Sequence, residues 1–492
     1  MADPQVRKTQ EWLNATYGSR AGWVRLDEDG LTGWSTIYGL RRALQAELGI
    51  SPLASGFGPA TTSAFRSKIG RIDASFKGAQ NVLCILSGAL WCKGYTAITL
   101  NRGAVFGFEG LSGSVATVRE DLGLGAGNSP FVDVKVMASL LSMDAYTVLG
   151  GYGGTAGVRS VQRWLNGTYH GRRDFALVPC DGVHSRSVQT ALLLALQYEL
   201  GMADGVANGN FGDGTKSGLK SQAVLGVGSS DGTKRFVRLF HAAMILNGLS
   251  VSLSSDFTSA TSGAISAFQS FMEIPQTGKG DYTTWCSLLV SCGDTSIATK
   301  GFDTSEKLTG GKAAAAVRRG YTHVGRYLVT GYYINGPELD EIRAAGLRLI
   351  PLFQRYNNEV VWMTYGEGAA QGVDALSRAR TLGLPSGSVI YFAVDFDATG
   401  DVVNGPVANY FQGVNNVMRS APNSYKVGIY APRNACQTMI DRGLAVGAYV
   451  SGMSTGYSGN MGYPMPQEWH YNQILETSTD LGGGDRQSGR FT

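Results

Sequence analysis

The sequence lacks the motifs that mark several large classes of protein. It contains no C-x-x-C pair, no H-E-x-x-H and no G-x-x-x-x-G-K-[ST], so zinc-binding and P-loop chemistries have no support. Its five histidines are scattered along 492 residues, too sparsely for a dedicated metal cluster. No run of about 18 apolar residues is present, so we expect no membrane span. We also expect no cofactor.

Charge is scarce as well. Charged residues make up 16% of the chain, and 42 Lys and Arg nearly balance 38 Asp and Glu, which leaves a net charge of +4. Proteins that bind nucleic acids or anionic membranes present a strongly basic surface, so we expect neither partner. A chain of this length is expected to form two or more domains, each able to bury its own core.

The sequence has few cysteines and no visible export leader. Met1 is followed directly by residues of an amphipathic helix, with no basic and apolar leader for export. Cys84 and Cys92 fall on one expected helix, too far apart for a disulfide. We therefore expect mostly buried thiols among the six cysteines.

The most informative stretch that is present is VIYFAVDFD, from Val389 to Asp397. An apolar, β-branched and aromatic run of this kind predicts a buried strand of a parallel sheet. Asp395 and Asp397 end it, and side chains two apart on a strand point the same way. Two carboxylates that face one site can perform acid–base chemistry. The alternative is that one caps the next helix and the other lies in solvent.

The sequence from residue 300 to 492 alternates short strands with helices, which predicts a compact (β/α) barrel of the TIM type. An open doubly wound sheet is the competing architecture. The expected strands are Lys300–Thr304, His323–Leu328, Arg348–Phe353, Val389–Asp397, Lys426–Ala431, Ala448–Gly452 and Trp469–Ile474.

In such a barrel, polar residues at strand ends converge on one face. We expect three catalytic candidates there, Asp303, Asp395 and Asp397. Further side chains on or near the strands are candidates for substrate contacts: Tyr391, Tyr430, Trp469, Gln473 and Arg326.

These motifs resemble those of the family 25 glycoside hydrolases, the lysozyme-like muramidases, which begin with a G-[IF]-D strand and carry a D-x-E strand. The chain is still more similar to their actinobacterial relatives, the glycoside-hydrolase-like domains. Those share GFDT, V-G-R-Y-L, the D-A-x-x-x-A-x-x-L-G-x-P segment from Asp374 to Pro385, and I-Y-F-A-V-D-F-D. The resemblance covers essentially all of residues 300–492.

One position departs from the muramidase pattern. Where those enzymes have D-x-E, this chain has Asp395-Phe396-Asp397, so Asp397 replaces the expected general acid. The resemblance implies that Asp397 donates a proton, while Asp395 and Asp303 position substrate, stabilise charge or activate water. For that role Asp397 must be largely buried, because burial raises the pKa of a carboxyl group.

The first 299 residues contain a duplication. VRKTQEWLNATY, starting at Val6, matches VRSVQRWLNGTY, starting at Val158, and the D-G, L-Q-x-E-L-G and F-G-x-x-T segments follow with closely similar spacing. Each copy predicts a small bundle of amphipathic helices. Trp12 and Trp164 occupy matching positions and are expected to be core residues.

These copies resemble the three-helix peptidoglycan-binding domain, with its V-x-x-L-Q-x-x-L-N and D-G-x-[FV]-G-x-x-T signatures. We expect two tandem pairs of such modules, at residues 1–150 and 151–296, followed by the barrel at 297–492. If the modules bind glycan, the candidate contacts are polar loop positions near Asn14, Asp29, Asn166 and Asp181.

The combined expectation is a cell-wall hydrolase that cleaves β-1,4 glycosidic bonds, with peptidoglycan or another cell-wall glycan as its partner. Such a protein acts outside the cell or at the wall. Without a visible leader, it would arrive by non-classical export, phage-type lysis or a delivery machine. The alternative is a non-catalytic glycan-binding or assembly protein whose barrel site is degenerate.

Overall fold

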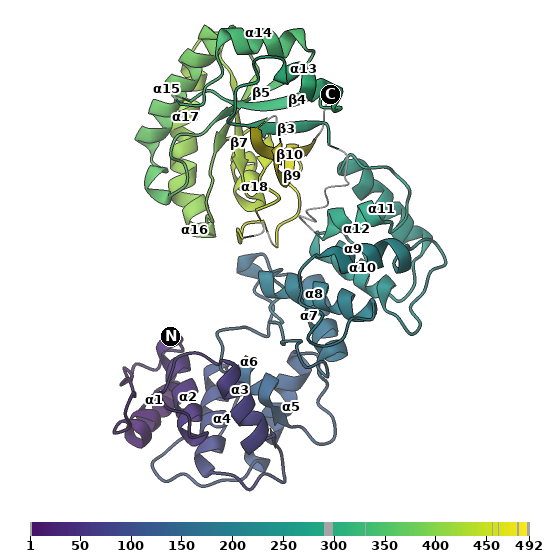
Figure 1. The fold of residues 1–492 in the computed structure, drawn as a ribbon. Coiled ribbons are helices and arrows are strands. Elements are labelled where there is room, and N and C mark those ends of the chain that lie inside the picture. The colour runs from purple at the N-terminus through teal and green to yellow at the C-terminus, as the bar shows by residue number, and fades with distance from the viewer. Residues whose placement is uncertain are drawn as a thin grey trace. The chain divides into compact units, whose positions relative to one another are not determined.

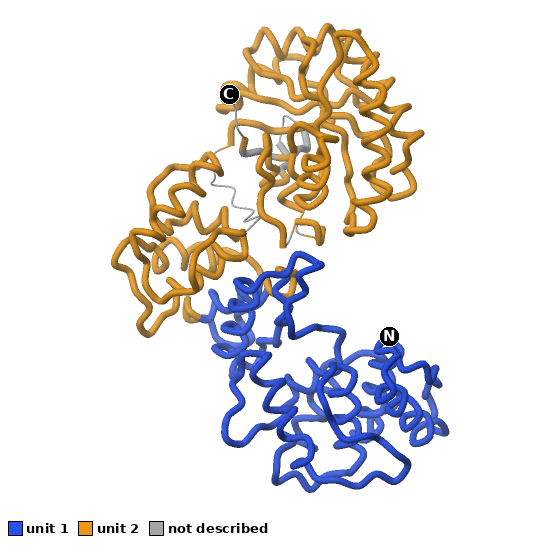
Figure 2. Tube along the Cα trace, turned by 180° about the vertical axis from the view of Figure 1, so that it is seen from behind, with its two compact units in different colours: residues 1–183, 190–198, 202–209 blue, residues 184–189, 199–201, 210–492 orange. Residues whose placement is uncertain are grey.

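The computed structural model describes residues 2–289, 299–329, 331–454, 456–460, 462–479 and 482–489. The chain forms two compact units, shown in Figure 2. The first comprises residues 1–183, 190–198 and 202–209, and the second comprises residues 184–189, 199–201 and 210–492.

The N-terminal region is helical, as expected, with one short antiparallel pair of strands, β1 (Arg71–Ile72) and β2 (Val132–Asp133). Its helices are α1 (Pro4–Tyr17), α2 (Trp34–Glu47), α3 (Pro59–Lys68), α4 (Gln80–Cys92), α5 (Glu109–Asp121), α6 (Val134–Leu140), α7 (Ala156–Tyr169), α8 (Arg186–Glu199), α9 (Asp213–Gln222), α10 (Phe236–Leu246), α11 (Ser259–Phe271) and α12 (Tyr282–Leu288).

The glutamine of the L-Q-like motif in the first repeat acts as an internal clamp. Gln10 on α1 is buried, donates from Nε2 to Asp29 Oδ1 at 2.8 Å, and accepts from the Gly30 N–H at 2.8 Å. Asn14, one turn later, holds both backbone groups of Leu26, each at 2.9 Å. The polar positions proposed for glycan contact are therefore occupied by bonds that fix the D-G loop.

The second repeat makes the same contacts. Gln162 donates to Asp181 Oδ1 and accepts from the Gly182 N–H, both at 2.8 Å. Asn166 holds both backbone groups of Val178, each at 2.9 Å. The shared motif thus specifies how the loop after the first helix is held. It does not by itself indicate a glycan site.

Replacing Gln162 by leucine should lower the free energy of unfolding of this region by about 1–3 kcal/mol. Leucine leaves the buried Gly182 N–H without its acceptor, and an unsatisfied buried donor carries its full desolvation cost. Thermal or urea unfolding would measure the change. The control is Ser160→Ala, which removes an exposed hydroxyl from the same helix. Equal stability of the two variants would contradict the clamp.

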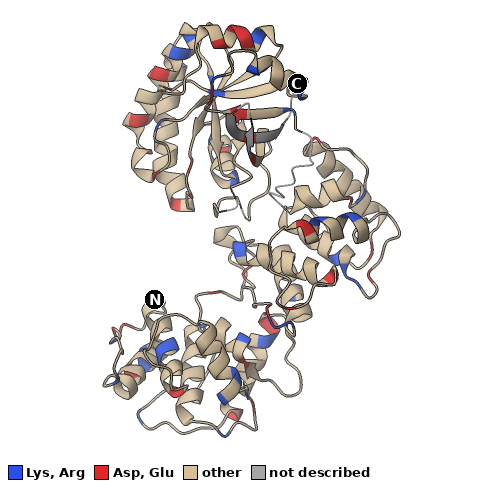
Figure 3. Ribbon diagram, in the orientation of Figure 1, with Lys and Arg blue, Asp and Glu red and all other residues tan. Residues whose placement is uncertain are grey.

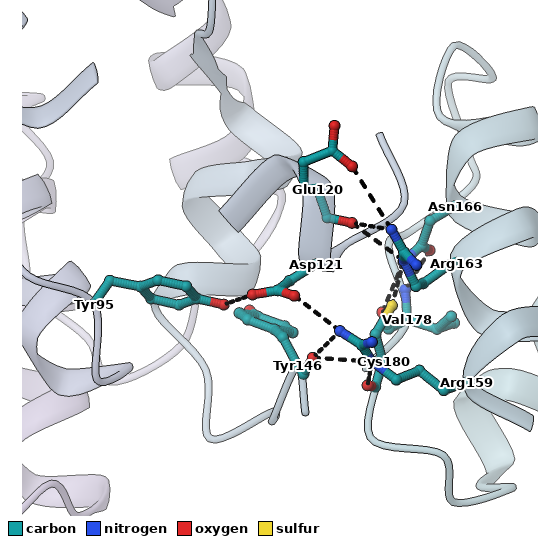
Figure 4. Close-up of polar contacts among 9 residues, drawn as sticks. All are labelled: Tyr95, Glu120, Asp121, Tyr146, Arg159, Arg163, Asn166, Val178 and Cys180. Atoms are coloured by element: carbon teal, nitrogen blue, oxygen red, sulfur yellow. Dashed lines mark hydrogen bonds and ion pairs between the residues drawn. The ribbon is translucent and has the colours of Figure 1, made fainter. Parts of the chain in front are cut away.

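A polar network joins α5 to α7 across residue 150 (Figure 4). The Arg159 guanidinium donates to Asp121 Oδ1 at 2.9 Å, to the Tyr146 carbonyl at 2.7 Å and to the Cys180 carbonyl at 3.0 Å. The Tyr95 hydroxyl donates to the other Asp121 oxygen at 2.8 Å. Within the first unit, the segments on either side of residue 150 are therefore tied together.

The C-terminal part forms a closed barrel, so the alternative architecture, an open doubly wound sheet, is wrong. Seven parallel strands match the seven expected from the sequence, and an eighth, antiparallel to both neighbours, closes the ring between the first and the seventh (Figure 1). The strands are β3 (Gly301–Thr304), β4 (His323–Tyr327), β5 (Arg348–Phe353), β6 (Val389–Ala393), β7 (Lys426–Ala431), β8 (Ala448–Val450), β9 (Trp469–Thr479) and β10 (Gly482–Gly489).

Helices lie outside the strands, and their surfaces carry charges of both signs interspersed (Figures 1 and 3). They are α13 (Lys312–Arg318), α14 (Gly336–Ala344), α15 (Tyr365–Thr381), α16 (Gly400–Val402), α17 (Ala408–Ser420) and α18 (Arg433–Asp441). Helices α15 and α17 approach closely because Gly368 and Gly413 lack side chains at their crossing. A Cβ on Gly368 would lie 2.0 Å from the Tyr410 carbonyl oxygen.

The barrel interior is rich in tyrosine. Alternation along the strands turns Tyr391, Tyr430 and Tyr449 inward, where they pack with Ile350 and Leu352. Tyrosine carries a hydroxyl into an otherwise apolar core, and that hydroxyl needs a partner when buried. The interior is therefore built to contact polar groups at its ends.

Two expectations from composition can also be compared with the structure. All five cysteines in the described residues are buried; Cys84, Cys92, Cys180 and Cys436 are free thiols, and Cys286 is the fifth. The sixth, Cys292, lies outside the described residues. In the part of the chain that the structure describes, no helix is both long and apolar enough to cross a bilayer.

Candidate active site

Carboxyl groups gather at the carboxyl end of the parallel strands. Asp303 on β3 is 3% exposed and accepts hydrogen bonds from the Tyr449 hydroxyl at 2.5 Å and from Gln473 Nε2 at 2.9 Å. Gly325, its neighbour on β4, leaves room for it, because a Cβ there would lie 2.6 Å from the Asp303 Cβ. The glycine of the V-G-R-Y-L motif thus serves the site.

A further carboxyl group comes from the closing strand. Asp485 on β10 is paired directly with Asp303 on β3, and Gln473 Nε2 donates to Asp485 Oδ2 at 2.8 Å. One amide nitrogen therefore binds both carboxyl groups. Sequence reasoning missed Asp485 because GGGDRQSG has no apolar alternation and does not read as a strand.

Both members of this pair hold a proton more tightly than an ordinary aspartic acid does. Burial raises the pKa of Asp303, against the opposing effect of its bonds from Tyr449 and Gln473. Burial also raises the pKa of Asp485, and the neighbouring Asp303 charge raises it further. Adjacent buried carboxyl groups that repel each other are the arrangement in which one stays protonated near neutral pH.

Asp395 belongs to the same site. It follows β6, is partly buried, and accepts from Gln354 Nε2 at 2.9 Å and from the Tyr457 hydroxyl at 3.1 Å. Its charge contributes to the raised pKa values of both Asp303 and Asp485, so the three carboxyl groups lie within electrostatic range. Burial and Asp395 together raise the pKa of Tyr457 to about 12, which keeps that hydroxyl a donor.

The role expected for Asp397 does not fit the structure. Strand β6 ends at Ala393, and the chain bends at Phe396, where the Ala398 N–H reaches the Phe396 carbonyl at 2.9 Å. The alternation therefore stops before Asp397, which is exposed. Its Oδ1 accepts from the backbone N–H and the hydroxyl of Ser458, at 2.7 and 2.6 Å. An exposed carboxyl lacks the burial that a general acid needs.

Three expected substrate contacts are also wrong. Trp469 is fully buried at the first residue of β9, at the opposite end of the barrel, and its indole donates to the Phe271 carbonyl at 3.0 Å. Tyr391 is buried as well, and its hydroxyl is 2.6 Å from His470 Nδ1. His470, considered beside the site from sequence, is thus at the amino end too.

Arg326 is the third expected substrate contact that the structure places elsewhere. It points out of the barrel towards α14, is fully buried, and binds Glu338 through Nε at 2.7 Å and Nη2 at 3.2 Å. Its Nη1 donates to the Thr304 carbonyl at 2.6 Å. Because every contact is internal, Arg326 supports the ends of β3 and β4 and is out of reach of a substrate.

Two expected contacts do lie at the site. Gln473 is 1% exposed and positions Asp303 and Asp485, so it acts on the carboxyl groups. The Tyr430 ring packs edge-on against Tyr449 at 4.9 Å between centroids, and burial raises its pKa, with Asp303 among the further causes. Gln473 therefore bonds two of the carboxyl groups directly, and Tyr430 packs on Tyr449, the tyrosine that donates to Asp303.

A cavity of about 720 Å³ lies at the other end of the barrel. Its lining includes Arg348 and Val389, the first residues of β5 and β6, together with Tyr391 and His470. Strands β5 and β6 pair only between Leu352 and Tyr391 and between Phe353 and Phe392, which leaves their first residues unpaired with each other. We place the chemistry at the carboxyl end, because the three interacting carboxyl groups are there. Among the described residues, no group of three or more His, Cys, Asp or Glu side chains could hold a metal ion.

The raised pKa values predict that the barrel is less stable at alkaline than at mildly acidic pH. In the folded state the pKa of Asp485 is raised to about 7, against an ordinary value of about 3.9. The folded state therefore binds the proton more tightly, and this stabilisation is lost as the pH rises from about 4 through about 7. Thermal unfolding at roughly pH 5 and pH 8 should show the decrease. The Asp485→Asn variant should show a smaller one, and equal decreases in both would contradict the assignment.

Two parts of the chain match known protein families. Residues 314–486 match the family described as Rv2525c-like, glycoside hydrolase-like domain, and residues 151–289 match the family described as FadG/YbfG, PGDB-like domain. The C-terminal barrel is thus a glycoside hydrolase-like domain of the Rv2525c type.

The whole chain is 40% identical over 489 residues to FadG, an uncharacterized protein of Bacillus subtilis, covering 98% of this chain and 83% of FadG. The chain belongs to the FadG family. It is also 38% identical to YbfG of the same organism, over 98% of this chain and 66% of YbfG, so it spans about two thirds of that relative.

Two solved structures are similar to part of the chain. The Tat-secreted protein Rv2525c of Mycobacterium tuberculosis is 16% identical, with a TM-score of 0.33, over 38% of this chain and 93% of Rv2525c. A B. stearothermophilus protein is 18% identical, with a TM-score of 0.30, over 39% of this chain and 95% of its own.

Proposed function

We propose that the barrel hydrolyses a cell-wall glycan, cleaving β-1,4 glycosidic bonds of peptidoglycan as a muramidase does, with Asp485 as the proton donor. The observation that carries this proposal is the raised pKa of Asp485, beside Asp303 and within electrostatic range of Asp395. Glycoside hydrolysis needs one carboxyl group that holds a proton and a second that acts as a base or nucleophile. The match of the domain to a glycoside hydrolase-like family agrees with this chemistry.

Each residue then has a defined task. Asp485 gives its proton to the glycosidic oxygen as the bond to the sugar carbon breaks, and positive charge develops on the sugar ring. The Asp395 carboxylate stabilises that charge or activates the attacking water, held in place by Gln354 and Tyr457. Burial and the charge of Asp303 keep the pKa of Asp485 high, and Gln473 fixes the geometry of the pair.

The helical region would hold the barrel on its substrate. Its sequence resemblance to peptidoglycan-binding modules supports this role, which requires the protein to reach the wall. The occupied loop positions around Asn14 and Asn166 direct the search for glycan contacts to other surfaces of these modules.

Reducing-end release from purified murein by the full chain tests the proposal. The wild-type protein should release reducing ends, and Asp395→Asn should release few or none while still sedimenting with the murein. Binding without release by the wild type would refute hydrolysis. If the wild-type protein shows no binding and no release, the glycan assignment is refuted altogether.

Glycan binding without turnover is the second candidate. It is favoured by Asp397, which stands where the muramidase pattern has its acid yet is exposed and bonded to Ser458. In that case the barrel serves recognition, and substitutions at Asp395 and Asp485 would alter affinity for murein with no turnover to lose.

A further inference from the structure

The loop between β5 and α15 presents an aromatic pair to solvent. The rings of Tyr356 and Trp362 stack, with centroids 5.1 Å apart and planes at 30°. Tyr356 is 64% exposed, so Trp362 covers one face of its ring and the other face is open. Val361 beside them is 62% exposed. A large apolar surface left open in this way marks an interaction site when it adjoins functional residues.

The backbone at Tyr356 is strained. Its φ is +61°, in the left-handed region that residues with a Cβ avoid, and a bulky tyrosine there is uncommon. Among the described residues, two other non-glycine residues have a positive φ, Glu273 and Asn423. Strain of this kind persists only where the surroundings fix it, and it clusters at sites that bind ligands.

The two neighbours of Tyr356 explain how the strain is maintained. Arg355 forms an ion pair with Asp374 on α15. Asn357 is fully buried, donates to the Ala393 carbonyl at 2.8 Å and accepts from Gln371 Nε2 at 2.9 Å. With Arg355 paired to α15 and Asn357 buried, the chain turns the Tyr356 ring outward onto Trp362.

The same loop is bonded to the candidate active site. Gln354, two residues before Tyr356, donates to Asp395 Oδ2 at 2.9 Å. The Asp395 N–H donates in turn to the Asn357 carbonyl at 2.9 Å. The aromatic pair is therefore fixed relative to Asp395 by contacts on both sides of Tyr356.

We infer that Tyr356, backed by Trp362, is a platform for a sugar ring of the glycan, in a subsite next to the one where the bond is cleaved. The apolar C–H face of a pyranose packs on an aromatic face, and the open face of Tyr356 offers one at a fixed position beside Asp395. This inference rests on the proposed function, because it takes the ligand of the barrel to be a glycan. It adds a subsite that extends binding beyond the sugars at the carboxyl groups.

A binding experiment in the full chain separates the platform from the site itself. Asp395→Asn is the background, which prevents turnover, and the probes are β-1,4-linked N-acetylglucosamine oligomers of two and of five sugars in calorimetry. The longer oligomer should bind at least about tenfold more tightly than the shorter one. Adding Tyr356→Asn should remove most of that advantage and leave the affinity for the short oligomer within about threefold.

The choice of asparagine keeps the test clear of folding defects. Asparagine accepts the left-handed backbone better than tyrosine does, so the variant should unfold at the same or a higher temperature. Tyr356→Phe keeps the ring and should restore binding of the longer oligomer. The control Tyr152→Asn removes a tyrosine that is 81% exposed in the helical region and should change neither affinity.

The outcomes are distinct. If Tyr356→Asn binds both oligomers as its background does, the platform is wrong and the glycan assignment stands. If the Asp395→Asn background binds neither oligomer nor murein, the proposed function fails and the platform fails with it. If the variant keeps its oligomer affinities but loses self-association or another protein contact, the surface is a protein interface and the inference is overturned.

Discussion

Replacing Asp485 by asparagine should reduce the rate of reducing-end release from murein by at least about 100-fold, the usual contribution of a positioned general acid. Asparagine keeps the shape of the side chain but has no acidic proton to donate. It also cannot ionise, so the repulsion of Asp303 that develops as Asp485 loses its proton is removed and the folded barrel should be at least as stable. Turnover by single-time-point and progress-curve assays, with an unfolding curve for each protein, would measure both effects.

Asp397→Asn is the matched control. The same chemical change is made at an exposed carboxyl bonded to Ser458, so activity should stay within about threefold of the wild type. The opposite ranking, with Asp397→Asn inactive and Asp485→Asn active, would return the acid to the position that the family motif suggests. It would also make the raised pKa of Asp485 a structural feature.

The largest loss of stability in the barrel is expected at the buried ion pair between Arg326 and Glu338. Both side chains are 0% exposed, and Glu338 also accepts from the Leu308 N–H at 3.0 Å. Replacing Arg326 by methionine leaves the Glu338 carboxylate buried without its charge partner. The expected cost is about 3–5 kcal/mol in the free energy of unfolding, measured from the urea transition of the barrel.

A double variant separates charge pairing from packing. In Arg326→Met with Glu338→Leu, no buried charge remains unpaired, so much of the stability should return. The surface pair Lys8–Glu11, at 2.8 Å, provides the contrast, because Glu11→Gln should cost at most about 1 kcal/mol. A double variant as unstable as Arg326→Met alone would mean that the lost packing of the arginine side chain, and not its charge, accounts for the effect.

The sequence predicted the strands of the barrel well, because short extended segments alternate with helices and turns along residues 300–492. It predicted the carboxyl-end location of Asp303 and Asp395 for the same reason. It failed at Asp397 because alternation was extended past Ala393, where the backbone leaves the strand. Periodicity gives the direction of a side chain only while the strand lasts.

Two other differences have separate causes. The sequence places Trp469 on a barrel strand but does not show where that strand begins. Strand β9 begins at Trp469, so this residue lies at the amino end of the barrel and not at the carboxyl end. Asp485 was missed because β10 is held by its neighbours and carries no pattern of its own. A strand that tertiary pairing creates is invisible to local propensity.

The closing strand has a consequence for how the barrel acquires activity. Asp303 and Asp485 come from the first and last strands of the domain, so their pairing is among its most non-local contacts. Contacts across so long a loop are entropically expensive and slow to form. On the proposed mechanism, Asp485 would therefore join the site only when the ring of strands closes, and a chain that has folded most of the barrel would still be inactive.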